Sequence, residues 1–150
     1  QLKSIELPSL TEYISDYAFE GTGISKLVIP QGVKSLGYYT FANCGNLTEI
    51  TVPKSVEFIN KNCFINCNNI EKVYCYINSI ADNADLYAND SVMKYIGDVN
   101  DDTTVDNEDA AIMLKNVYDS DKNEVPVLIW DYNNDGAIDI LDVVGVLQDI

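Results

Sequence analysis

The sequence contains no histidine and no arginine, and each absence excludes a group of functions. Without histidine, serine–histidine–aspartate triads and most catalytic zinc sites are excluded. The nine basic residues, all lysines, stand against 24 acidic residues, which gives a net charge of −15. A nucleic-acid surface needs clustered cations, and so does a protein face that binds an anionic membrane. The charge balance therefore argues against both partners.

Long apolar runs and an N-terminal signal peptide are also missing. No stretch reaches the roughly 18 apolar residues of a membrane-spanning helix. Because Gln1 already lies within a repeat, we expect the chain to be part of a longer protein, so the missing signal peptide says little about secretion. A chain of 150 residues is long enough for one ordinary domain or two small ones.

The acidic residues are concentrated in the last third of the chain. Residues 1–96 hold 10 acids and 7 lysines, a net charge of −3, whereas residues 97–150 hold 14 acids and 2 lysines, a net charge of −12. Acidic tails are often disordered, but this one also contains many valines, isoleucines and leucines and a tryptophan. Dense carboxylates on a foldable scaffold suggest a site for a hard cation.

Three segments in the first part of the chain repeat with a period of 22 or 23 residues. Apolar residues recur in register, among them Ile14, Leu36 and Ile59, and Phe19, Phe41 and Phe64. Leu7-Pro8, Ile29-Pro30 and Val52-Pro53 keep the same steps. A period of about 20 to 29 residues with fixed apolar positions indicates a leucine-rich-repeat solenoid, and the alternation before each proline predicts one short strand per coil.

The repeated phrase x-F-x-x-C-x-x-L-x-x-I-x-V-P resembles the BspA-like leucine-rich repeats of bacterial surface and secreted proteins. The resemblance covers about residues 2–76 and implies a solenoid domain over residues 1–96, with a C-terminal cap at residues 77–96. Within the cap, the apolar spacing predicts a short helix over residues 79–88 with Ser79 as its N-cap. A last strand is predicted at residues 92–96.

The four cysteines, Cys44, Cys63, Cys67 and Cys75, all lie in the first part of the chain. Cys44 and Cys67 occupy one repeat position, where the first copy has Thr22. Stacked coils would place these small side chains over one another inside the solenoid. We therefore favour thiols that pack as small hydrophobic groups. A disulfide and a metal site remain open alternatives.

Two similar acidic loops lie in the last third, at residues 98–109 (DVNDDTTVDNED) and 131–142 (DYNNDGAIDILD). Oxygen-bearing side chains occupy positions 1, 3, 5, 9 and 12 of each loop, and position 7 offers a backbone carbonyl. This is the arrangement of an EF-hand loop, which surrounds Ca²⁺ with about six to eight oxygens. Helices are predicted after the loops, at about residues 107–118 and 140–148. Apolar Val105 and Ile138, at position 8, predict a short strand that pairs the loops.

Position 12 is aspartate rather than the usual glutamate, and no helix precedes either loop at the usual place. Tandem D-x-N-x-D loops, each followed by one helix, resemble the type I dockerin of cellulosomal proteins, over residues 97–150. The resemblance implies a small helical module that is folded by two Ca²⁺ ions and binds a cohesin domain of a scaffoldin. The expected fold class is therefore α+β: a leucine-rich-repeat solenoid followed by a helical dockerin.

The resemblance also implies the calcium ligands. In the first loop these are the side chains of Asp98, Asn100, Asp102 and Asp109, with Asp106 acting through water and Thr104 through its carbonyl. In the second loop they are Asp131, Asn133, Asp135 and Asp142, with Asp139 acting through water and Ala137 through its carbonyl. Position 6 is Gly136 in the second loop but Thr103 in the first. Because that turn favours positive φ, which costs a β-branched residue, we expect the first site to be weaker or distorted.

Helical spacing separates a core face from a partner face on the two predicted helices. The expected core comprises Ala110, Met113, Leu114 and Val117, then Val143, Val146, Leu147 and Ile150, with Trp130 between the halves. The expected cohesin-facing residues are Asn107, Glu108, Ala111, Ile112 and Lys115, then Ile140, Leu141, Val144 and Gln148. Dockerins choose partners through loop positions 10 and 11, which are polar in the first loop and apolar in the second. One binding orientation should therefore dominate. An alternative is that Ile140 and Leu141 pack against the solenoid or its cap.

The sequence therefore predicts a non-catalytic, extracellular cellulosome component for polysaccharide degradation, in which a calcium-dependent dockerin tethers a repeat module that recognises protein or glycan. Tyr13, Tyr17, Tyr38, Tyr39, Tyr74 and Tyr76 either stack on sugars or pack between coils. An alternative is the ancillary C-terminal part of a larger secreted enzyme whose catalytic module lies upstream. A calcium buffer or sensor is disfavoured, because the loops lack flanking helix pairs. Scattered acids in the solenoid predict no catalytic pair.

Overall fold

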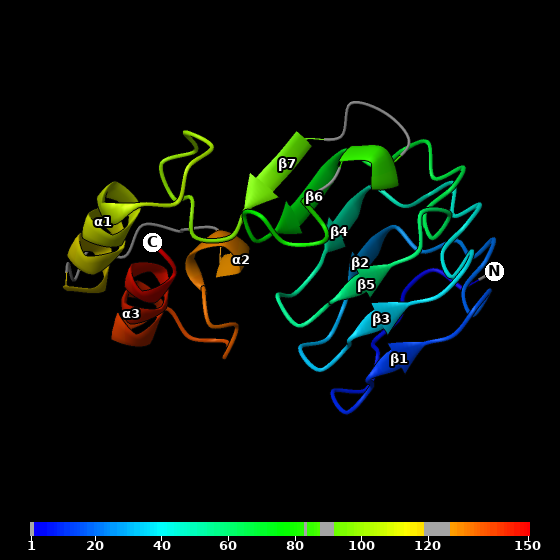
Figure 1. Cartoon of the computed structure of the whole chain (residues 1–150), viewed down its shortest axis with the longest axis horizontal. Helices are drawn as coiled ribbons and strands as arrows, with labels where there is room; N and C mark the ends of the chain where they lie inside the picture. Colours follow the sequence, from blue (N-terminus) through cyan, green and yellow to red (C-terminus); the bar gives the residue numbers. More distant parts are fainter. Residues whose placement is uncertain (1, 83, 88–91, 119–126) are drawn as a thin grey trace. The chain divides into compact units, whose positions relative to one another are not determined.

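The computed structural model describes residues 2–82, 84–87, 92–118 and 127–150 (Figure 1). It divides into two compact units, Gln1–Met93 and Lys94–Ile150. The first unit is a solenoid-like repeat region of short strands, and the second is a small helical part. Among the described residues, no helix is long and apolar enough to cross a membrane.

One ladder is formed by a strand from each coil, at the position that the sequence predicts. β2 (Lys26–Val28), β4 (Glu49–Thr51) and β6 (Lys72–Cys75) pair in parallel and in register, and β7 (Val92–Tyr95) lies next to β6. Leu27, Ile50 and Val73 face inward from the middle of this ladder and are buried. Their neighbours point outward, because side chains alternate along a strand.

A second parallel ladder joins β1 (Tyr13–Ile14), β3 (Ser35–Leu36) and β5 (Phe58–Ile59). The sequence predicted only one strand per coil, so this ladder corrects that expectation. Strands of two residues are too short for alternation to reveal them. Ile14, Leu36 and Ile59 mark the ladder nonetheless, because each is the buried inward residue of its strand.

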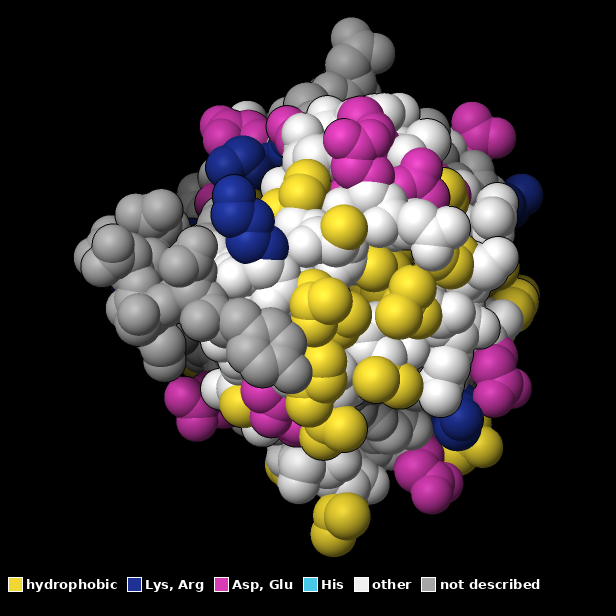
Figure 2. Space-filling view, turned by 90° about the vertical axis from the view of Figure 1, so that its left-hand side faces the viewer, with side chains coloured by type: hydrophobic (Ala, Val, Ile, Leu, Met, Phe, Trp, Pro, Cys, Tyr) yellow, Lys and Arg dark blue, Asp and Glu magenta, His cyan; other side chains and the backbone are white. Residues whose placement is uncertain are grey.

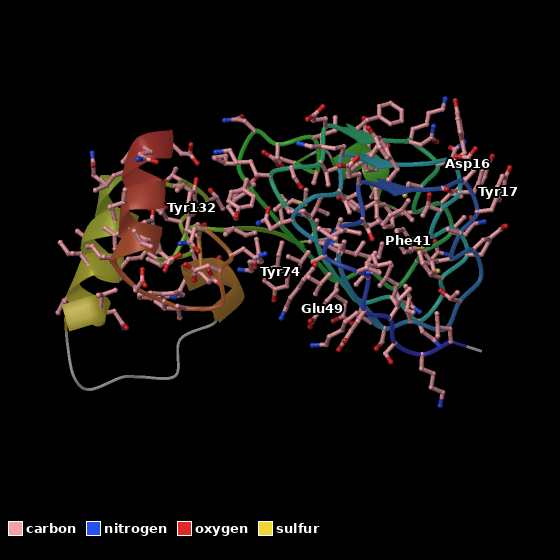
Figure 3. The ribbon with its side chains drawn as sticks, turned by 90° about the horizontal axis from the view of Figure 1, so that it is seen from below. Asp16, Tyr17, Phe41, Glu49, Tyr74 and Tyr132 are labelled. Carbon is pink, nitrogen blue, oxygen red and sulfur yellow. The ribbon has the colours of Figure 1, made fainter. Side chains whose placement is uncertain are left out.

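Stacked aromatic rings run through the solenoid interior. The ring centroids of Phe19, Phe41 and Phe64 follow one another at 5.3 and 5.6 Å, and Tyr87 lies 5.5 Å beyond Phe64. Phe41, labelled in Figure 3, is fully buried within this stack. The Tyr87 ring is tilted by 33° from Phe64, and its hydroxyl donates to the carbonyl of Ala81. The phenylalanines that recur at one position of the repeat therefore form a continuous internal stack.

The four cysteines are free and buried, as expected for packing side chains. Thr22 and Cys44 stack with Oγ1 and Sγ 3.2 Å apart, and the Cys67 thiol donates to the carbonyl of Phe41 at 3.0 Å. Burial raises the pKa of the Cys63 thiol to about 12 and that of Cys75 to about 12. The Cys63 and Cys75 thiols therefore remain protonated at neutral pH and pack as small apolar groups.

The cap differs in part from its prediction. β7 agrees with the expected last strand, but the helix expected over residues 79–88 is reduced to the 3₁₀ turn η1 (Ala84–Leu86). Ser79 and Asp82 each donate a backbone hydrogen bond to the carbonyl three residues earlier, which makes successive turns instead of a helix. Residues 83 and 88, which that helix would include, lie outside the described residues.

The helical unit contains α1 (Asn107–Tyr118), α2 (Val127–Trp130) and α3 (Ile140–Asp149). α1 and α3 confirm the predicted helices. The short helix α2 ends directly before the loop at residues 131–142, so the expectation that no helix precedes either loop is wrong for the second one. Its four residues are too few to show periodicity. Neither Val105 nor Ile138 lies in a strand, so the predicted pairing at position 8 is wrong.

α1 and α3 pack together with a narrower core than predicted. Ala110, Met113, Val143, Val146 and Trp130 are buried, as expected. Leu114, Leu147 and Ile150 are instead exposed, and Val117 is only half-buried. Because one neighbouring helix covers only a narrow stripe, the flanking apolar positions stay outside the contact.

Candidate functional site

The two acidic loops, loop 1 (residues 98–109) and loop 2 (residues 131–142), each end in the first turn of a helix, α1 and α3 respectively. In loop 1 the Asp98 carboxylate accepts the backbone N–H groups of Asp102 and Thr103 at 3.1 and 3.0 Å. Asn100, Asp102 and Asp106 each accept the N–H group two residues further on, at 2.8 to 3.0 Å. These successive turns curl the chain around its own side-chain oxygens.

Asp109 joins the end of loop 1 to its beginning. One carboxylate oxygen accepts the N–H of Val99 at 2.9 Å, and the other accepts the N–H of Asp106 at 2.9 Å. The carboxylate at position 12 therefore joins the second residue of the loop to the ninth, whereas the carboxylate at position 1 binds the middle of the loop.

Loop 2 repeats this pattern position by position. Asp131 accepts the N–H groups of Asp135 and Gly136, and Asp142 accepts those of Asn133 and Asp139. The turns at Asn133, Asp135 and Asp139 are also present. Asp139 and Asp142 form a reciprocal capping box at the start of α3.

Four loop carboxylates are buried: Asp98, Asp109, Asp131 and Asp142 are each at most 5% exposed. Among the ion pairs of the described residues, none joins a lysine to any of the four. Desolvation raises the pKa of Asp98 and of Asp142, because burial disfavours the charged form. Burying an ionised carboxylate without a cation is costly, so a bound cation would stabilise both loops.

The side-chain oxygens of the two loops accept hydrogen bonds from backbone N–H groups and do not form a preformed cluster of acids in the described residues. Counting only Asp, Glu, His and Cys side chains, no group of three in the described part of the chain is placed to hold a metal ion. Each predicted ligand set also includes an asparagine amide and a backbone carbonyl. Such mixed oxygen donors suit a hard cation such as Ca²⁺ or Mg²⁺.

Position 6 has positive φ in both loops, as the sequence analysis expected. The φ angle is 72° at Thr103 and 91° at Gly136. A β-branched residue in this region is strained by about 1 to 2 kcal/mol, whereas glycine is not. The loops therefore share one fold but differ in backbone strain.

Sequence reasoning missed Tyr132, which is labelled in the helical unit in Figure 3. Its ring lies between two glycines of this unit. A Cβ atom on Gly97 would lie 2.8 Å from this ring, and one on Gly145 would lie 2.6 Å from it. The Tyr132 hydroxyl also donates to Asp149 at 2.5 Å. Gly145, in the middle of a predicted helix, was the available signal, because helix interiors disfavour glycine.

We expect Gly145→Ala to destabilise the helical unit, although alanine is the better helix former by about 1 kcal/mol. The new methyl group would push the Tyr132 ring off α3, and the displaced packing should outweigh that gain by about 1 kcal/mol or more. Urea unfolding followed by Trp130 fluorescence would measure the change. Val144→Ala, an exposed position on the same helix, is the matched control and should stay within about 0.5 kcal/mol. A more stable Gly145→Ala protein would contradict the packing role.

The residues predicted to face a partner lie on α1 and α3, apart from the helix–helix core. Ile112 is half-buried, and the others are exposed: Asn107, Glu108, Ala111, Lys115, Ile140, Leu141, Val144 and Gln148. On the solenoid, Tyr13, Tyr17 and Tyr38 are exposed, whereas Tyr76 is buried and has the Lys54 ammonium over its ring. Tyr17 stacks on Tyr39 with centroids 5.2 Å apart. Packing is therefore confirmed for Tyr76 and for the Tyr17–Tyr39 pair, whereas stacking on sugars stays a prediction.

The in-register strand ladders, the 22- or 23-residue period and the internal stack of rings define the first unit as a leucine-rich-repeat solenoid, a fold used for protein interaction. The family model of the BspA type leucine-rich repeat region matches residues 1–95, and the chain belongs to this family. Such repeats are typically non-catalytic and are typical of surface or secreted bacterial proteins. No curated protein and no solved structure matches the chain.

Proposed function

We propose that this protein is a non-catalytic, extracellular tether: its second unit acts as a calcium-dependent dockerin, binds a cohesin of a scaffoldin, and so attaches the repeat solenoid to a cellulosome. The observation that carries this proposal is the pair of matching loops with buried carboxylates at positions 1 and 12. The exposed residues of α1 and α3 supply the surface for the cohesin. The solenoid supplies a second interaction surface for protein or glycan.

In this proposal each loop binds one Ca²⁺ ion through oxygen ligands. Loop 1 offers Asp98, Asn100, Asp102, Thr104, Asp106 and Asp109, and loop 2 offers Asp131, Asn133, Asp135, Ala137, Asp139 and Asp142. The ions supply positive charge at buried carboxylates. Two ions would bring the net charge of residues 97–150 from −12 to about −8. Metal binding and folding of the unit are then coupled.

Binding of the full chain to a panel of recombinant cohesin modules, with Ca²⁺ and with EDTA, tests this function. At least one module should bind in Ca²⁺ and be released by EDTA. The variant Asp109→Ala/Asp142→Ala should bind none, because both loops lose the carboxylate that closes them. A chain that binds no cohesin, or binds equally in EDTA, would refute the proposal.

We expect the two calcium sites to differ in affinity because of position 6. Thr103→Gly should relieve the strained turn of loop 1 and tighten that site about fivefold, which corresponds to about 1 kcal/mol. The reciprocal variant Gly136→Thr should weaken loop 2 by a similar factor. Calorimetric titration of Ca²⁺ would resolve both changes. Two equal sites in the unmodified chain would contradict this expectation.

A further inference from the structure

The residue that precedes loop 1 is held by residues at the entrance to loop 2. Gly97 is buried, and its N–H donates to the carbonyl of Ile129 at 2.9 Å. Ile129 belongs to α2 and stands two residues before Asp131, the first residue of loop 2. Because Asp98 follows Gly97 directly, this hydrogen bond ties the first residue of loop 1 to the start of loop 2.

The ring of Tyr132, at position 2 of loop 2, makes a second link to Gly97. A Cβ atom on Gly97 would lie 2.8 Å from this ring and 3.1 Å from the side chain of Val105, at position 8 of loop 1. The φ angle of Gly97 is 100°, in a region where residues other than glycine are strained. Glycine therefore allows the ring to lie directly against the backbone that leads into loop 1.

The same ring is anchored to α3, the helix that begins within loop 2. A Cβ atom on Gly145 would lie 2.6 Å from the ring, and the Tyr132 hydroxyl donates to Asp149 in the last turn of α3 at 2.5 Å. Figure 2, which looks at the α1–α3 end, shows exposed hydrophobic side chains gathered in one area of the surface. Tyr132 is instead only 8% exposed, so its contacts lie inside the unit. The ring therefore joins loop 2 and α3 to the start of loop 1.

The first half of the unit has no counterpart to this link. Counting from the start of each loop, Tyr132 corresponds to Val99 and Gly145 corresponds to Ile112, so both the ring and the glycine beneath it are replaced. The strand pair that the sequence predicted at position 8 of the loops is also not formed. The link between the loops is therefore made by Tyr132 and Gly97, and it comes from the second half alone.

We propose that Tyr132 is a positioning residue that couples the two calcium sites. This inference rests on the proposed function, in which each loop binds one Ca²⁺ ion. A closed loop 2 holds the Tyr132 ring in place, the ring holds Gly97, and Gly97 positions Asp98 as the first ligand of loop 1. Because coupling between binding sites is reciprocal, each filled site raises the affinity of the other by the same factor, about tenfold.

Calorimetric titration of the full chain with Ca²⁺, in a double-mutant cycle, tests this coupling. Asp135→Ala removes a carboxylate ligand of loop 2 but leaves the capping box of α3 in place, so the remaining binding reports loop 1. This change should weaken loop 1 about tenfold in the unmodified chain and less than about twofold in the Tyr132→Leu background. Tyr132→Phe, which keeps the ring, should preserve the tenfold factor, roughly.

Val146→Ala is the control for a merely structural role of Tyr132. Val146 is buried between α1 and α3, so its truncation destabilises the unit without changing the link to Gly97. It should weaken both sites and leave the coupling factor unchanged. An equal fall of the factor in Val146→Ala and Tyr132→Leu would overturn the inference, as would a loop 1 that Asp135→Ala leaves unchanged. A chain that binds no Ca²⁺ would refute the proposed function as well, whereas uncoupled binding at both loops refutes this inference alone.

Amide hydrogen exchange gives a second test that leaves Tyr132 unchanged. Asp102→Ala removes the matching carboxylate of loop 1, so added Ca²⁺ is bound by loop 2 alone. After correction for intrinsic rates, the Gly97 N–H should then exchange about tenfold more slowly than the N–H of Thr104, which loses its acceptor in this variant. Equal exchange at the two positions would overturn the inference, even if Tyr132→Leu fails to fold.

Discussion

Removal of Ca²⁺ with EDTA is expected to unfold the helical unit while the solenoid stays folded. Ligand binding at about 1,000 times Kd stabilises a folded unit by about 4 kcal/mol per site, which for two sites is comparable to the whole stability of a small domain. Without the ions, buried Asp98, Asp109, Asp131 and Asp142 would lack a counter-charge. Mutual repulsion within a unit of net charge −12 adds to the loss.

Trp130 makes this experiment specific. It is the only tryptophan of the chain and is buried in the helical unit, so its fluorescence reports that unit alone. EDTA should shift its emission to longer wavelength, and excess Ca²⁺ should reverse the shift. The circular dichroism of the strand ladders should persist and melt in a separate transition. An unchanged Trp130 spectrum in EDTA would show that the loops fold without a metal ion.

Phe41→Ala is expected to be one of the most damaging single substitutions in the solenoid, with a cost of about 3 to 5 kcal/mol. Its ring is fully buried and lies between the rings of Phe19 and Phe64, so truncation removes two stacking contacts and leaves a cavity. Urea unfolding followed by circular dichroism would measure the loss. The Trp130 transition in the same sample should be unchanged, because it reports the other unit.

Phe58→Ala is the matched control for this substitution. It removes the same side chain from the outward face of β5, where the ring is 53% exposed, and its cost should be about 1 kcal/mol or less. A similar loss in both variants would show that the internal stack does not hold the coils together.

The solenoid was predictable because the same pattern of apolar residues occurs in three successive segments of the sequence. Three copies place Phe19, Phe41 and Phe64 in one register, and the stack then follows from the spacing of parallel strands. The second ladder was not predictable, because two-residue strands carry no periodicity. The cap helix failed for a related reason: backbone turns at Ser79 and Asp82 compete with a helix that spans fewer than three turns.

In the helical unit, the starts of α1 and α3 followed from the loop pattern, because the last loop residues form the first helical turn. The sequence pattern did not predict how many residues the core between α1 and α3 contains. A helical apolar stripe does not show how many neighbours will cover it, and Leu114 and Leu147 turned out exposed because α1 and α3 cover only a narrow contact. Gly145 inside a predicted helix indicated a close contact, but its partner, Tyr132, is determined by tertiary packing and could not be named from the sequence.

The internal stack has two unlike ends, and this determines where the solenoid first opens. Each coil contacts only its neighbours, so opening proceeds coil by coil rather than all at once. At one end Tyr87 is buried and hydrogen-bonded, whereas at the other Phe19 is only half-buried. Amide hydrogens of β1 should therefore exchange with solvent fastest, and protection should rise toward β5 and β6. We therefore expect the solenoid to unfold progressively, starting from the coil that contains Phe19.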